Sequence, residues 1–142
     1  MKIVASYPVI VHEALEACRD FYCRWFGFHV VFEASWFVLL QAGEGAPVQL
    51  AFITPEHPSA PPSPAPFRGA GVFLTLQVAD AARAYAELAQ AGLRFAHPLT
   101  DEPWGQRRFG VLDPAGTWVD VVEQTEPAPD FWAPYLPASH AR

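Results

Sequence analysis

The sequence predicts the same order of strands and helices in two consecutive segments of the chain. The first copy has a strand over residues 4–11, a helix over 13–26, and short strands over 28–32, 36–41 and 48–53. The second copy has a strand over 72–78, a helix over 80–91 that begins at Asp80 and ends at Gly92, and strands near 93–96, 107–112 and 117–123. Two such units predict an α+β protein made of two similar modules.

The two copies also correspond position by position. Tyr7 and Phe73 are 66 positions apart, whereas Gln49 and Asp120 are 71 apart, and a longer loop over 98–106 absorbs the difference. The proline-rich residues 57–66 favour an extended linker between the copies. We therefore expect one domain over 1–126, with module one at 1–56, a linker at 57–69 and module two at 70–126, followed by a Pro- and aromatic-rich tail at 127–142.

The stretch from Trp104 to Glu123 predicts two strands joined by a tight turn. The sequence Asp-Pro-Ala-Gly at 113–116 supplies Pro where φ is near −65° and Gly where φ becomes positive. The second of these strands places Asp120 between apolar neighbours, where a carboxylate is costly to bury unless it has a partner. Asp120 is therefore the first candidate for a functional residue.

This hairpin, PWGQRRFGVLDPAGTWVDVVE, resembles the closing hairpin of the vicinal oxygen chelate superfamily, which includes glyoxalase I, bleomycin-resistance proteins and extradiol dioxygenases. The pairs Phe21-Tyr22 and Trp25-Phe26 followed by Gly27-Phe28 are similar to a second stretch of that family. The resemblance implies paired βαβββ modules that form a half-open, mostly antiparallel barrel around a ligand cavity. It also implies a small-molecule partner and a homodimer.

In metal-dependent members of that family, the resemblance places the ligands at positions that are Tyr7, Gln49, Phe73 and Asp120 here. Phe73 has no donor atom, and Tyr7 would have to lose a proton with a reference pKa near 10. Gln49 and Asp120 alone would hold a divalent metal poorly unless the substrate supplied most of the ligands. We therefore expect no metal cofactor.

Strand alternation places Trp118 on the same face as Asp120. The family resemblance implies that Arg108 and Gly110 on the neighbouring strand also face inward, which gives a pocket lined by aromatic rings with a few polar points. Gly110 either leaves room for a ligand or eases a twisted strand, and Arg108 either pairs with Asp120 or grips the other end of a ligand. Trp104, in the long loop, is a candidate lid, and its ring and that of Trp118 are expected to stack on a flat ligand. The candidate ligand-binding residues are Tyr7, Phe37, Leu39, Gln49, Phe73, Trp104, Arg108, Gly110, Trp118 and Asp120.

Composition and residue spacing disfavour several classes of partner and site. Nine basic against 15 acidic residues give a net charge of −6, which disfavours nucleic acid, and no apolar run reaches the length of a membrane span. Cys18 and Cys23 match neither a disulfide framework nor a Cys-x-x-Cys motif, so we expect reduced cysteines and a cytoplasmic protein. The five histidines lack ligand spacing, so we interpret them as surface or capping residues.

These observations favour a metal-free binding protein of the bleomycin-resistance type that sequesters an aromatic or peptide antibiotic-like ligand. The alternative is an enzyme of glyoxalase or dioxygenase type, a lyase, isomerase or oxidoreductase in which Asp120 is the catalytic base or a metal ligand. A structural or regulatory domain without a ligand also stays open. The aromatic tail is expected to cover an open sheet edge or to pack on a second subunit.

Overall fold

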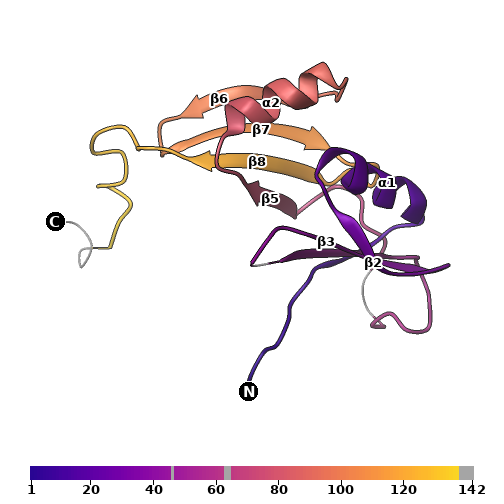
Figure 1. The fold of residues 1–142 in the computed structure, drawn as a ribbon. Coiled ribbons are helices and arrows are strands. Elements are labelled where there is room, and N and C mark those ends of the chain that lie inside the picture. The colour runs from indigo at the N-terminus through magenta and orange to yellow at the C-terminus, as the bar shows by residue number, and fades with distance from the viewer. Residues whose placement is uncertain (46, 63–64, 138–142) are drawn as a thin grey trace. The chain divides into compact units, whose positions relative to one another are not determined.

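The computed structural model describes residues 1–45, 47–62 and 65–137, and the chain divides into two units (Figure 1). The first unit comprises Met1–Gly71 with the short segment Asp113–Thr117, and the second comprises Val72–Leu112 and Trp118–Arg142. In these described residues each unit has one helix and one four-stranded sheet, which confirms the α+β class and the repeated β-α-β-β-β order. Within the described residues, no helix is long and apolar enough to span a membrane.

The first unit's sheet has the strand order β1-β4-β3-β2, in which only β1 and β4 run parallel. Its elements are β1 (Val9–Val11), α1 (Leu15–Trp25), β2 (His29–Ala34), β3 (Phe37–Ala42) and β4 (Val48–Ile53). The strand predicted from residue 4 begins only at Val9. Pro8 explains the difference because it has no N–H to donate to a ladder, although its carbonyl accepts from the Ala51 amide at 3.0 Å.

Helix α1 covers one face of this sheet through a single buried stripe. Leu15, Cys18 and Tyr22 form the stripe, and the Tyr22 ring lies 5.4 Å from the ring of Phe28 and 5.8 Å from that of Phe52. Because side chains alternate along a strand, the neighbours of Phe52 on β4 point to the face away from α1. This face carries three of the predicted site residues, Phe37, Leu39 and Gln49.

The Asp113–Thr117 turn belongs to the first unit through a buried carboxylate. Asp113 Oδ1 accepts from the amides of Ala115 (2.9 Å) and Thr117 (2.8 Å), while Oδ2 accepts from the Tyr22 hydroxyl at 2.6 Å. Gly116 has φ of +84°, which confirms the turn predicted from Asp-Pro-Ala-Gly. Burial, and then the negative charge of Asp113, raise the pKa of Tyr22 well above its ordinary value, so the phenol stays protonated.

The second unit repeats the topology with the strand order β5-β8-β7-β6. Its elements are β5 (Phe73–Gln77), α2 (Ala81–Gln90), β6 (His97–Glu102), β7 (Gln106–Leu112) and β8 (Trp118–Gln124). The strand predicted near 93–96 is wrong, because β6 begins at His97 and takes up most of the loop expected over 98–106. Instead, the Phe95 ring packs 4.3 Å from the ring of Tyr85 on α2.

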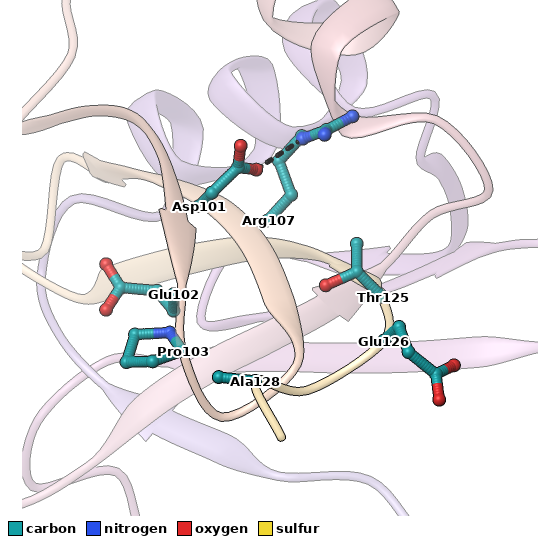
Figure 2. Close-up of a pocket in the computed structure, with 7 residues that line it drawn as sticks. All are labelled: Asp101, Glu102, Pro103, Arg107, Thr125, Glu126 and Ala128. Carbon is teal, nitrogen blue, oxygen red and sulfur yellow. Dashed lines mark hydrogen bonds and ion pairs between the residues drawn. The ribbon is translucent and has the colours of Figure 1, made fainter. Parts of the chain in front are cut away.

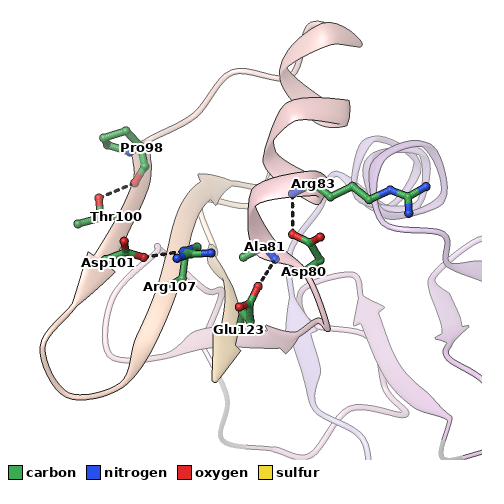
Figure 3. Close-up of polar contacts among 8 residues, drawn as sticks. All are labelled: Asp80, Ala81, Arg83, Pro98, Thr100, Asp101, Arg107 and Glu123. Atoms are coloured by element: carbon green, nitrogen blue, oxygen red, sulfur yellow. Dashed lines mark hydrogen bonds and ion pairs between the residues drawn. The ribbon is translucent and has the colours of Figure 1, made fainter. Parts of the chain in front are cut away.

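Polar contacts fix α2 on one face of this sheet (Figure 3). Asp80 caps the helix as predicted by accepting from the Arg83 amide at 2.9 Å, and Glu123 of β8 accepts from the Ala81 amide at 2.9 Å. Alternation from Glu123 sends every second β8 side chain to the face away from α2. We call this the open face; its residues on β7 and β8 are Arg108, Gly110, Leu112, Trp118, Asp120 and Val122.

Candidate functional site

Asp120 lies in the middle of the open face and is 4% exposed. It stands opposite Gly110 on β7 and opposite Thr75 on β5. Its Oδ1 accepts from the indole Nε1 of Trp118 at 3.2 Å, and its Oδ2 is 3.5 Å from Nη1 of Arg108. The predicted ion pair with Arg108 is thus formed, and these two partners together compensate the burial of the carboxylate.

Trp118 fills the space above Gly110. A Cβ atom built on Gly110 would lie 2.3 Å from Cζ2 and 2.7 Å from Cε2 of the Trp118 indole, which is far inside van der Waals contact. The interpretation of Gly110 as leaving room for a ligand needs correction, because the protein's own indole takes that room. Gly110 lets Trp118 lie flat across β7 and reach Asp120.

His97 is a residue of this face that sequence reasoning missed. It stands opposite Gly110 on β6, and its ring centroid is 6.4 Å from that of Trp118. Among the described residues, His97 Nε2 and Arg108 Nε are buried without a hydrogen-bond partner, although Arg108 Nε is 3.8 Å from Glu102 Oε1. No sequence pattern marked His97, because Pro98 made the segment look like a loop and only strand register brings the histidine beside Gly110.

Trp104 lies in the tight turn between β6 and β7, because β6 occupies most of the loop in which a lid was expected. Its indole Nε1 donates to Gln106 Oε1 at 2.9 Å, and the Arg108 guanidinium carbon lies 5.1 Å from the ring centroid. The same ring is 6.4 Å from Phe131 of the C-terminal tail. Arg108 therefore connects Trp104 to Asp120, while the ring itself contacts the tail.

The remaining candidates lie at strand ends or in the first unit. Phe73 begins β5 beside Trp118 and is 63% exposed, so its ring is available to a ligand. Tyr7 precedes β1 and is exposed. Gln49 donates through Nε2 to Gln41 Oε1 at 2.9 Å.

Arg108 is the charged partner of Asp120, and metal-ligating side chains do not gather around the carboxylate in the described residues. A divalent site requires several convergent imidazole, thiolate or carboxylate donors. Among the described residues, no group of three His, Cys, Asp or Glu side chains gathers to form one. The expectation of no metal cofactor stays a prediction.

His12 and His57 make local contacts within the first unit. His12 Nδ1 accepts from the Ala14 amide at 3.0 Å in the segment before α1, but the helix itself has no side-chain cap. His57 stacks on Trp36 with ring centroids 3.9 Å apart. His140 lies outside the described residues.

Comparison with known proteins identifies the fold family. The chain is similar to a glyoxalase/bleomycin resistance protein/dioxygenase from Nocardioides, with a TM-score of 0.70 and 22% identity over 89% of this chain and 86% of that one. It is also similar to a member of the Glyoxalase/bleomycin resistance protein/dioxygenase superfamily from Sphaerobacter thermophilus DSM 20745, with a TM-score of 0.64 and 28% identity over 87% of this chain and 98% of that one. A bleomycin resistance determinant encoded on the transposon Tn5 has a TM-score of 0.62 and 23% identity over 86% of this chain and 98% of that one. No curated protein gives a significant match. The family model Glyoxalase/Bleomycin resistance protein/Dioxygenase superfamily matches residues 5–121. The resemblance inferred from the closing hairpin is thereby confirmed, and the chain belongs to this superfamily.

Proposed function

We propose that the chain is a metal-free binding protein that sequesters an aromatic or peptide antibiotic-like molecule on the open face around Asp120. The observation that carries the proposal is the buried Asp120 carboxylate held between the Trp118 indole and the Arg108 guanidinium. Such a group offers a fixed charge next to a flat apolar surface, the combination by which pockets orient small ligands. A homodimer, as the family resemblance implies, is part of the proposal.

The charges of this face favour a ligand with a positive or hydrogen-donating group. Arg108 is the cation between the two carboxylates of Asp120 and Glu102, at 3.5 and 3.8 Å. The three groups therefore sum to one negative charge, in the same sense as the net charge of −6 for the whole chain. A negative field of this kind raises the association rate of cationic ligands.

The alternative enzyme, with Asp120 as base or metal ligand, has less support in this geometry. A general base must direct an oxygen with an available lone pair toward its substrate. Here one oxygen of Asp120 accepts from Trp118, and the other faces Arg108. Each carboxylate oxygen keeps a further lone pair for a ligand's donor, and the two partners fix the carboxylate in one position, so we favour binding over proton transfer.

The test is a thermal-shift screen of cationic aromatic and glycopeptide antibiotics, because a ligand of the native state raises the melting temperature by mass action. For a compound that binds, Asp120→Asn is expected to weaken affinity by about tenfold or more, the effect of removing one charged hydrogen-bonding partner. Asp101→Asn is the matched control, since that carboxylate is exposed and pairs with Arg107 away from the open face.

Three results would contradict the proposal. One is equal affinity for the wild type and Asp120→Asn. Another is metal near one equivalent in protein purified without chelator. If Asp120→Asn fails to fold, Trp118→Phe keeps an aromatic ring but removes the N–H donated to Asp120, and unchanged affinity in that variant would also contradict it.

A further inference from the structure

Four aromatic rings form a concave cluster where the C-terminal tail meets the β6–β7 turn. Trp104, Phe131, Trp132 and Tyr135 line a hollow of about 370 Å³, which we call the aromatic cup. The Phe131 ring is central: its centroid lies 6.4 Å from Trp104, 5.2 Å from Trp132 and 5.9 Å from Tyr135. The tail lies beyond the family match at 5–121, so the superfamily fold does not account for the cup.

Hydrogen bonds from the tail to the turn hold the rings in place. Trp132 donates its indole N–H to the Trp104 carbonyl at 2.8 Å, and the Ala128 amide donates to the Pro103 carbonyl at 2.9 Å. Gly105 makes this approach possible, because a Cβ there would lie 2.9 Å from the Thr125 carbonyl oxygen. Since Trp104 also donates its N–H, to Gln106, both indoles of the cup have satisfied donors and offer a ligand only their ring surfaces.

The surroundings of the cup are acidic. Residues 125–137 contain Glu126 and Asp130 but no lysine or arginine. A neighbouring hollow of about 540 Å³, lined by Pro103 and Ala128 among others, carries the carboxylates of Asp101, Glu102 and Glu126 (Figure 2). Its one cation, Arg107, pairs with Asp101 at 2.6 Å. A positive ligand at the cup would therefore meet a favourable field.

Ring surfaces attract cations, because the face of an aromatic ring carries partial negative charge. One face of Trp104 already takes the Arg108 guanidinium, 5.1 Å from the ring centroid. That charge is compensated by Asp120 and Glu102, so it adds little repulsion to a second cation. Several rings around one hollow, with acidic groups nearby, suit an alkylated ammonium group better than a neutral apolar group.

We propose that the aromatic cup binds an organic ammonium cation, of the tertiary or quaternary class. This site is separate from the proposed binding of a ligand around Asp120, and it uses residues outside the family match. The cation would lie against Trp104, Trp132 and Tyr135 above Phe131, and the carboxylates of Glu126 and Asp130 would raise its local concentration.

The test compares choline with 3,3-dimethylbutan-1-ol, which has the same shape without the charge, by calorimetric titration of the full chain. Choline should bind saturably, and the neutral analogue should bind about tenfold or more weakly. Tyr135→Ala should weaken choline about five-fold, the size of one cation–π contact. Tyr135 is 70% exposed, so the substitution should spare the fold. Phe32→Ala is the matched control, an exposed ring on β2 outside the cup.

Equal affinity for choline and its neutral analogue would overturn the proposal, because the hollow would then be merely apolar. It would also be overturned by the absence of saturable choline binding, or by equal losses in Tyr135→Ala and Phe32→Ala. Trp118→Phe, which alters the open face without changing a charge beside Trp104, should leave choline affinity unchanged. That result separates this site from the open face, so either proposal can fail without the other.

Discussion

Replacing Gly110 by alanine tests whether the Trp118 indole is fixed on the open face. The new methyl group would lie 2.3 Å from Cζ2 of the indole, so the ring must move. The ring is rigid and its N–H is bonded to Asp120, so moving it also removes a hydrogen bond to a buried charge. Overpacking costs about 1 to 3 kcal/mol and a lost charged hydrogen bond about 1.5 to 3 kcal/mol, and partial relaxation suggests a total of about 2 to 4 kcal/mol.

The test is a double-mutant cycle of Gly110→Ala and Trp118→Ala. The free energy of unfolding of each protein is measured by urea unfolding, monitored by far-UV circular dichroism. In the Trp118→Ala background the methyl group enters vacated space, so Gly110→Ala should cost less than about 0.5 kcal/mol. The coupling energy should therefore exceed about 1.5 kcal/mol. An equal cost in both backgrounds would refute the reasoning, since the strain would then come from the strand itself.

Three further predictions concern the buried groups of the first unit. Tyr22→Phe leaves Asp113 Oδ2 without its partner, and we expect a loss of about 1.5 to 3 kcal/mol in urea unfolding, against little change for Tyr85→Phe. Burial raises the pKa of Cys18 to about 12, so in native protein at pH 8 the half-buried Cys23 should react with a thiol reagent well before Cys18; equal rates would contradict this. The pKa values of Cys18 and Tyr22 are higher in the folded than in the unfolded protein, so their contribution to stability is complete below about pH 8.5. As the pH rises further, the free energy of unfolding should fall by up to about 1.4 kcal/mol per pH unit for each group. Unfolding measured from pH 8 to 11 should show this decline, and Cys18→Ala should make it shallower.

Elements with strong local signals could be predicted from the sequence. Strand β4 has the predicted bounds, Asp80 caps α2, and the Asp113–Gly116 turn forms as its residues indicate. Each depends on residues close together in the chain, such as a cap accepting from an amide three positions on. The family resemblance followed from such segments as well, because the closing hairpin is continuous in sequence.

Features set by register or by distant contacts could not be predicted. Strand β6 pairs only with β7 at a sheet edge, where Pro98 and polar residues are tolerated, so it lacks the apolar pattern of a strand. Phe95, in the apolar segment before it, packs on Tyr85 of α2 instead of pairing in a strand. The position of the Trp118 indole over Gly110, and of His97 beside it, depends on which residues stand opposite one another across three strands.

The hydrogen bond from Tyr22 to Asp113 affects how the first unit can fold while the chain is being synthesised. The two residues are 91 positions apart in the sequence. At a synthesis rate of about 5 to 20 residues per second, Asp113 is therefore added roughly 5 to 20 s after Tyr22. During that time the hydroxyl of Tyr22, a fully buried ring in the finished protein, lacks its native acceptor. A ribosome paused in the second half of the message would therefore display an unfinished first unit, and a fragment ending at Gly71 would lack the five residues that complete it.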